Sequence, residues 1–229
     1  MIGPCRRARP ARASRSSAAP FACRLVIMAR EPVAGRAKTR LAREVGVAQA
    51  MRFVRHGTVA LLQRVGRDPR WQTALAVAPD NGVASRMWPR AMVRIGQGGG
   101  DLGARMQRLF DRAPRGPVII IGTDVPGIRA AHIAQAFRLL GNHDAVFGPA
   151  EDGGYWLIGL RRRPRTLRPL SDVRWSSPHA LADTVDNLAG RRLARAPTLA
   201  DVDNASDFAR YASMFGRRVL PASVPQSPR

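Results

Sequence analysis

Two short, nearly continuous apolar segments constrain the fold more than any other feature of this chain. They are ACRLVIMA at 22–29 and PVIIIG at 117–122, and such runs are typical of strands that are covered on both faces of a parallel sheet. Strands alternating with helices predict a three-layer α/β/α fold with a mostly parallel central sheet. The further strands are expected at 71–78, 91–95, 144–148 and 155–160, and the helices at 39–45, 47–65, 101–113, 130–140 and from Asp203 or Asn204 to Phe215.

One domain is expected over residues 21–218, because a chain of 229 residues can build one sizeable core. The arginine-rich, acid-free segment 1–20 is expected to be a disordered tail, and the Pro/Ser-rich segment 219–229 to be frayed. The two cysteines, Cys5 and Cys23, form neither a disulfide framework nor a metal pattern, which fits a reducing cytoplasm. No apolar run approaches the roughly 18 residues of a membrane helix, so we expect a cytoplasmic protein without a membrane span.

The formal net charge of +22 raises the hypothesis of a nucleic-acid partner. However, the arginines are scattered and lack the interleaved aromatic residues of a surface that binds single strands. Lysine occurs once and glutamate only at Glu31, Glu44 and Glu151, which indicates a compositional bias towards arginine. We therefore favour this bias as the source of the charge and do not expect a nucleic-acid partner.

The single lysine, Lys38, lies in a glycine-containing loop between the first strand and the first helix. Backbone N–H groups and cations at such a junction suit a diphosphate, and a lysine binds phosphate oxygens as a compact charge. The alternative is a solvated surface lysine. The loop contains neither the Walker A motif nor the dinucleotide-binding Gly-x-Gly-x-x-Gly pattern. The predicted phosphate-binding residues are Gly35, Arg36, Lys38 and Arg40.

A second glycine-rich loop, QGGGDLGARM at 97–106, follows the third predicted strand. Glycines allow a backbone to approach a ligand closely, so this loop is a second candidate for nucleotide binding. The alternative is an ordinary loop in which Asp101 caps the following helix. The candidate residues are Gln97, Gly98, Asp101 and Gly103.

Two aspartates are candidate metal ligands. Asp124 follows the buried strand at 117–122 and precedes Pro126, a position suited to a divalent cation that bridges phosphates. Its alternative role is to cap the local turn. Asp203 could add a second ligand, although capping of the last helix explains it equally well. The expected cofactor is Mg²⁺ or Mn²⁺.

The segment GPAEDGGYW at 148–156 places two adjacent carboxylates in a glycine turn beside two aromatic residues. Glu151 or Asp152 could act as a base or orient a hydroxyl group. Gly153, Gly154 and Tyr155 are then candidates for binding the acceptor. The alternative is a simple hairpin turn, because Asp-Gly strongly favours one.

Taken together, five segments in this order resemble the bacterial DUF2064 family of glycosyltransferase A-type, radical-SAM/selenodomain-associated transferases. They are PVAGRAKTRL, QGGGDLGARM, IGTDVP, GPAEDGGYWLIGL and DVDNASDF, and the resemblance spans about residues 22–216. It implies the nucleotide-diphospho-sugar transferase fold and a relation to the molybdenum-cofactor and phospholactate nucleotidyltransferases. It also implies that Lys38 and its neighbours bind nucleotide phosphates, that Asp124 is the metal-binding aspartate, and that 151–155 is the signature turn.

The function expected from the sequence is a metal-dependent glycosyltransferase that moves a sugar from a nucleotide-sugar donor to a small-molecule acceptor. The first alternative is a nucleotidyltransferase that joins a nucleoside triphosphate to a phosphorylated small molecule. The second alternative, from another class, is a nucleic-acid-binding protein.

Overall fold

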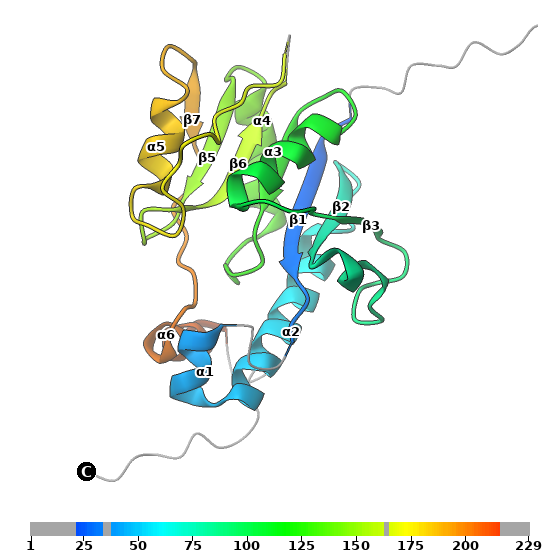
Figure 1. The fold of residues 1–229 in the computed structure, drawn as a ribbon, viewed down its shortest axis with the longest axis vertical. Helices are drawn as coiled ribbons and strands as arrows, with labels where there is room; N and C mark the ends of the chain where they lie inside the picture. Colours follow the sequence, from blue (N-terminus) through cyan, green and yellow to red (C-terminus); the bar gives the residue numbers. More distant parts are fainter. Residues whose placement is uncertain (1–21, 34–37, 163–164, 216–229) are drawn as a thin grey trace, which may run out of the picture.

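A computed structural model describes residues 22–33, 38–162 and 165–215. Within these residues, seven strands form one sheet in the order β3-β2-β1-β4-β6-β5-β7 (Figure 1). The predicted tails at 1–20 and 219–229, and the candidate residues Gly35 and Arg36, lie outside the described residues. The strands are β1 Arg24–Arg30, β2 Gln72–Ala78, β3 Val93–Gly96, β4 Val118–Ile121, β5 Ala145–Pro149, β6 Tyr155–Leu160 and β7 Leu193–Arg195.

Helices cover both faces of the sheet and produce three layers. On one face, α2 (Val47–Val65) and α4 (Ala130–Leu140) pack against side chains such as Leu25 and Ile27 of β1. On the other face, α3 (Leu102–Arg112) and α5 (Ala180–Asp186) pack against side chains such as Val26. Because successive residues of a strand point to opposite faces, one apolar strand supplies both cores, and this explains the continuous apolar runs. The three-layer α/β prediction is confirmed.

The sheet is mostly parallel, but β6 runs antiparallel to both of its neighbours, β4 and β5. The cause is the turn at 150–154, which joins β5 to β6 as a hairpin. The hairpin alternative for this turn is therefore correct as a description of the backbone. Neither β7 nor α5 was predicted as a separate element. β7 has only three residues, Leu193–Arg195, which is too short for a recognisable apolar pattern.

A third, smaller apolar cluster joins α1 (Thr39–Val45) and α6 (Ala205–Phe215) to the start of α2, and the two helices lie together in Figure 1. Its centre is an edge-to-face contact between Phe53 and Phe208, whose ring centroids are 5.2 Å apart. Asn204 caps α6 by accepting a hydrogen bond from the N–H of Asp207. Since Lys38 precedes α1 and Asp203 precedes α6, this cluster brings two residues distant in sequence together.

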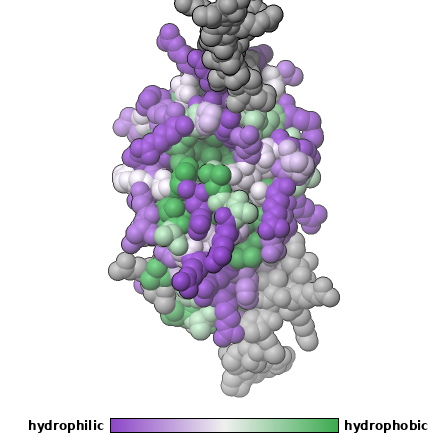
Figure 2. Space-filling model, turned by 90° about the vertical axis from the view of Figure 1, so that its right-hand side faces the viewer, coloured by the Kyte–Doolittle hydropathy of each residue, from purple (hydrophilic) through white to green (hydrophobic). Residues whose placement is uncertain are grey.

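The strand order determines where the site lies. β1 pairs in parallel with β2 on one side and with β4 on the other, so the connections leave β1 and β4 in opposite directions. Ligands of such sheets bind in the crevice beyond the carboxyl ends of these strands. One face of the molecule shows an apolar hollow bordered by hydrophilic side chains (Figure 2). No helix within the described ranges is both long and apolar enough to cross a membrane.

Candidate active site

The side chain of Lys38 lies between two carboxylates at the carboxyl edge of the sheet. Its Nζ atom donates a hydrogen bond to Asp203 and lies 3.5 Å from Oδ1 of Asp124. Only 11% of the Lys38 side chain is exposed, so it is not the solvated surface lysine of the alternative interpretation. Its φ of 46° is left-handed, a conformation that is uncommon for residues other than glycine and that clusters at functional sites.

Burial and neighbouring charges shift the pKa values of Lys38, Asp201 and Asp203 in this cluster. Burial lowers the pKa of Lys38, but the carboxylates of Asp124, Asp203 and Asp201 outweigh it and raise the pKa overall. Burial, together with the negative charges of Asp203 and Asp152, raises the pKa of Asp201 to about 6. For Asp203, burial acts in the same direction, but its hydrogen bond with Lys38 prevails and lowers the pKa. Three carboxylates therefore act on the single ammonium of Lys38, and the excess negative charge favours an additional cation.

The carboxylate of Asp124 is accessible to a metal ion. No backbone N–H group of the described residues donates to its carboxylate, and 64% of its side chain is exposed. The turn-capping alternative therefore finds no support in the hydrogen bonds. Within the described ranges, no group of three or more His, Cys, Asp or Glu side chains is arranged to hold a metal ion. Two carboxylate ligands nevertheless fit Mg²⁺ or Mn²⁺, because these hard ions complete their coordination with water and phosphate oxygens.

One cavity of about 770 Å³ connects this cluster to the other predicted loops. At one end it is lined by the carboxyl ends of β1 and β2 and by the glycine-rich loop. At the other end it is lined by Asp152, Tyr155 and Trp175, with Lys38 and Asp124 also in its wall. A cavity of this volume is within the usual range for small-molecule and cofactor sites.

The glycine-rich loop is fixed from several directions. Asp101 caps α3 by accepting a hydrogen bond from the N–H of Ala104 at 2.7 Å, as the capping alternative predicted. Arg108 donates to the carbonyl groups of Gln97 and Gly99, and Asp80 accepts from the N–H of Gly98. The loop is therefore held in one conformation before any ligand arrives.

The hairpin turn separates its two carboxylates. Asp152 lines the cavity and accepts a hydrogen bond from the N–H of Gly154 at 2.9 Å. Glu151 lies 3.4 Å from Arg210 of α6 and is not part of the cavity wall. Gly153 has a φ of +84°, and a Cβ atom there would collide with the carbonyl of Pro178. Glycine at this position thus allows the turn to pack against the segment 171–179.

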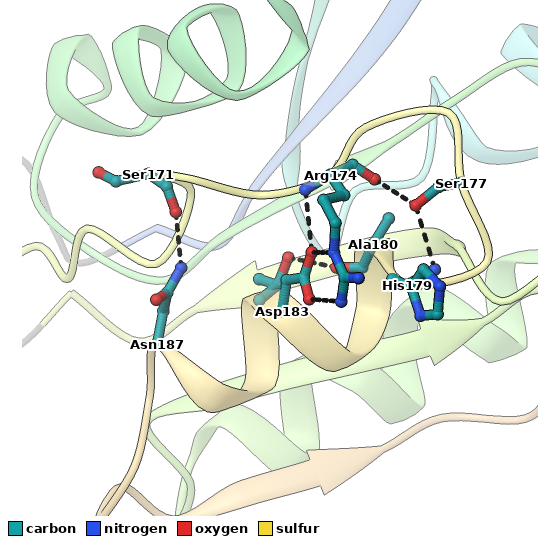
Figure 3. Close-up of polar contacts among 8 residues, drawn as sticks. Ser171, Arg174, Ser177, His179, Ala180, Asp183 and Asn187 are labelled. Carbon is teal, nitrogen blue, oxygen red and sulfur yellow. Dashed lines mark hydrogen bonds and ion pairs between the residues drawn. The ribbon is translucent and has the colours of Figure 1, made fainter.

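The segment 171–179, which carries Trp175, forms a wall of the cavity and is tied to α5 (Figure 3). Arg174 binds Asp183 through two side-chain hydrogen bonds, and its backbone N–H donates to the same carboxylate. The hydrogen bonds from Arg174 hold the pKa of Asp183 at about 2. Trp175 packs edge-to-face against Tyr155, with ring centroids 6.4 Å apart. The apolar wall that Tyr155 and Trp175 form is therefore positioned by polar contacts outside the cavity.

The structure brings most of the predicted site residues to the cavity, but not all. A smaller cavity of about 510 Å³, which shares Lys38, Asp152 and Asp203 with the main one, is lined by Arg40. Gly103 is buried where α3 packs against Leu170 and Trp175, and Gly98 supports the loop from outside the cavity wall. Those that line the main cavity are Lys38, Gln97, Asp101, Asp124, Asp152, Gly154, Tyr155 and Asp203.

Two residues of the site were not among the predicted ones. Asp201 lies two residues before Asp203, and its only sequence signal is the Asp-Val-Asp repeat. Trp175 lies in a segment without any motif, so no pattern in the sequence marked it as part of the cavity. Both reach the site through tertiary packing.

Comparison with solved structures first places the chain in a fold class, that of the nucleotide-diphospho-sugar transferases. A candidate nucleotide-diphospho-sugar transferase from Desulfovibrio desulfuricans G20 is 28% identical, with a TM-score of 0.74 over 86% of this chain and 90% of that one. A cytidylyltransferase from Leptospira borgpetersenii serovar Hardjo-bovis (strain JB197) is 12% identical, with a TM-score of 0.56 over 86% and 88%. Rv0371c from Mycobacterium tuberculosis H37Rv, in complex with manganese, is 16% identical, with a TM-score of 0.51 over 83% and 97%.

The chain belongs to the DUF2064 family, which is described as an uncharacterized protein conserved in bacteria and whose model matches residues 61–177. The resemblance that the five segments indicated is thereby confirmed. No curated protein matches the chain in sequence.

Proposed function

We propose that this protein is a metal-dependent transferase that moves a sugar from a nucleotide-sugar donor to a small-molecule acceptor. The observation that carries the proposal is the Lys38 ammonium between Asp124 and Asp203, in the wall of a cavity where β1 and β4 end. The fold shared with the Desulfovibrio protein supports a transferase that uses a nucleotide. The coincidence of one cation, several carboxylates and a nucleotide-sized cavity favours a diphosphate-containing donor.

Lys38 binds the phosphate groups of the donor in this proposal, and Arg40 adds positive charge from the smaller cavity. Asp124 and Asp203 would hold Mg²⁺ or Mn²⁺, which would neutralise the charge on the departing nucleoside diphosphate. The manganese complex of Rv0371c supports a divalent ion in this fold. Lys38 neutralises part of the same charge and keeps Asp203 ionised, as the lowered pKa of Asp203 indicates.

Asp152 is the proposed base for the acceptor hydroxyl. It lies on the cavity wall, whereas its neighbour Glu151 faces Arg210. Tyr155 and Trp175 form the apolar wall beside it, and Gly154 leaves room at the turn. Burial raises the pKa of the Tyr155 hydroxyl, so this group stays protonated and serves to shape the wall, not to take the proton.

Nucleotidyl transfer is the second candidate, because the Leptospira cytidylyltransferase and a CTP-bound sugar-acid synthetase share the fold. The two reactions differ in the bond that breaks. Glycosyl transfer releases a nucleoside diphosphate, whereas nucleotidyl transfer releases pyrophosphate.

The proposal can be tested with the full chain in two steps. Thermal shift with nucleoside di- and triphosphates and nucleotide sugars, each with and without Mn²⁺, identifies the ligand class, because a bound ligand raises the melting temperature. Phosphorus NMR of the reaction with the best donor and a set of sugar and polyol acceptors then identifies the product. Release of a nucleoside diphosphate that depends on acceptor supports glycosyl transfer. Release of pyrophosphate supports the second candidate, and no stabilisation by any nucleotide contradicts both.

A further inference from the structure

Gln97 is one of the few polar residues that are buried in the described part of the chain. It directly follows β3, only 5% of it is exposed, and it lines the main cavity beside the ends of β1 and β2. Burial of an amide side chain is unfavourable unless its polar atoms are hydrogen-bonded. The hydrogen-bond partners of each polar atom of Gln97 therefore indicate which of its groups is available to a ligand.

Every hydrogen-bonding group of Gln97 except one has a partner. Its backbone N–H donates to the carbonyl of Val77, and its own carbonyl accepts from Arg108. The Nε2 group donates to the carbonyls of Ala29 at 3.2 Å and Ala76 at 2.9 Å. No residue in the described ranges donates to Oε1.

Oε1 is open to the cavity. Among the residues that the structure describes, the side-chain atoms that are fully enclosed without a partner are the hydroxyl of Thr73 and Oε1 of Gln107, and Oε1 of Gln97 is not among them. The amide cannot rotate to present its NH₂ group instead, since Oε1 would then face the carbonyls of Ala29 and Ala76. Gln97 thus offers the cavity one acceptor of fixed orientation, and it offers no donor.

The part of the donor nearest Gln97 follows from the proposed function, on which this inference rests. The phosphates lie at Lys38, and the acceptor lies at Asp152 and Tyr155. At the remaining end, Gln97 lines the cavity together with the apolar residues Met28, Ala78 and Met106, and the strand end and loop beside them add the charged residues Arg30, Asp101 and Arg105. A planar, mainly apolar group with polar edges suits this end, which is the chemistry of a nucleobase.

We propose that Oε1 of Gln97 selects the base of the donor by accepting a hydrogen bond from its exocyclic amine. Cytosine, guanine and adenine carry such an amine. Uracil has a carbonyl where cytosine has the amine, and hypoxanthine lacks the amine of guanine. In the same binding position, uracil turns a carbonyl towards the buried acceptor and hypoxanthine turns a C–H group towards it, because their ring N–H donors lie one ring position away. The acceptor then loses water without a donor in line with it, and unpaired polar groups of this kind are a strong source of discrimination.

Two matched pairs of nucleotides test the inference by calorimetry on the full chain with Mn²⁺. They are cytidine and uridine diphosphate, and guanosine and inosine diphosphate. In the pair that binds more tightly, the amine-bearing member should bind at least about tenfold better, the scale of one hydrogen bond to a buried group. Gln97→Met should reduce this preference to within about twofold. Gln107→Met makes the same change on α3 outside the cavity wall and should retain the preference.

The results separate the inference from the proposed function. If no nucleotide binds to the folded wild type, both are overturned. If nucleotides bind but uridine or inosine diphosphate binds as well as its partner, only the selection by Gln97 is overturned, and this comparison does not depend on any variant folding. A preference that persists in Gln97→Met also overturns it.

Discussion

Replacing Lys38 by methionine removes the ammonium that Asp124 and Asp203 share while keeping most of the apolar stem. Exposed ion pairs contribute about 0–1 kcal/mol, and breaking a buried pair costs about 3–5 kcal/mol. Lys38 is 11% exposed but its partners are 64% and 43% exposed, so solvent screening reduces the higher value. We expect Lys38→Met to lower the free energy of unfolding by about 2 kcal/mol at pH 7.5, which lowers Tm by about 4–8 °C for a domain of this size.

The pH dependence provides a second check. The raised pKa of Lys38 means that its contribution is present below its unfolded pKa and is lost only as the pH rises through the folded one. The lowered pKa of Asp203 means that its contribution is present above its unfolded pKa and is lost as the pH falls through the folded one. The cost of Lys38→Met should therefore shrink below about pH 4.

Urea unfolding of the chelator-treated protein at pH 7.5 and pH 3.5 measures both effects. Arg168→Met is the matched control, because it removes the exposed pair with Asp111, whose atoms lie 3.1 Å apart, and should cost less than about 1 kcal/mol. Equal stability of Lys38→Met and wild type at pH 7.5, or the same difference at both pH values, would refute the shared ion pair.

Three further changes test other parts of the account. The pKa of Asp201 is raised to about 6 in the folded protein, so the free energy of unfolding falls as the pH rises from about 4 to about 6. Asp201→Asn should therefore raise the free energy of unfolding, measured with urea, by on the order of 1 kcal/mol at pH 8 after allowance for solvent screening, and by little at pH 4. No increase at pH 8 would contradict the crowding of carboxylates. Gly153→Ala should lower the free energy of unfolding by about 1–3 kcal/mol, because the φ of Gly153 is +84° and the new Cβ would meet Pro178. The control Gly57→Ala in α2, where a Cβ meets nothing within 4 Å, should be neutral or stabilising. Equal effects of the two changes would refute the close packing at Gly153. Arg174→Ala should speed amide hydrogen exchange of residues 175–177 by releasing the segment from Asp183 while leaving nucleotide affinity unchanged. Unchanged exchange would show that the ion pair does not hold this wall.

The sequence was sufficient to predict the layers and most of the strands. Strand β4 and strand β1 are apolar on both faces because helices cover both, and this pattern is local and readable. The sequence also predicts that the loops after β1, β3 and β4 lie at the same edge of the sheet, because these strands are parallel. By contrast, the antiparallel β6 and the short β7 depend on pairing partners that no local pattern specifies.

The site was predictable only where a loop carried its own signal. The contact between Lys38 and Asp203 joins residues 165 positions apart, and it exists because α1 and α6 share the Phe53–Phe208 cluster. Glu151 and Asp152 are equivalent in the sequence, and the geometry of the hairpin decides that only Asp152 lines the cavity. Trp175 reaches the wall through the contacts of Arg174 with α5, which a linear pattern cannot show.

The most direct test of the proposed transferase is the change Asp124→Asn. Asparagine keeps the shape of the side chain and removes the charge that a divalent cation requires, and no described backbone N–H group depends on this carboxylate. Folding should therefore be preserved. The matched control is Asp186→Asn, an exposed residue at the end of α5 and outside the cavity wall.

Calorimetric titration of the best nucleotide or nucleotide sugar, first with Mn²⁺ and then with chelator, gives the answer. We expect the wild type and Asp186→Asn to lose affinity at least about tenfold in chelator. Asp124→Asn should bind at this low level even with Mn²⁺. If Asp124→Asn keeps full binding stimulated by Mn²⁺, Asp124 is not the metal ligand and the proposed mechanism is contradicted.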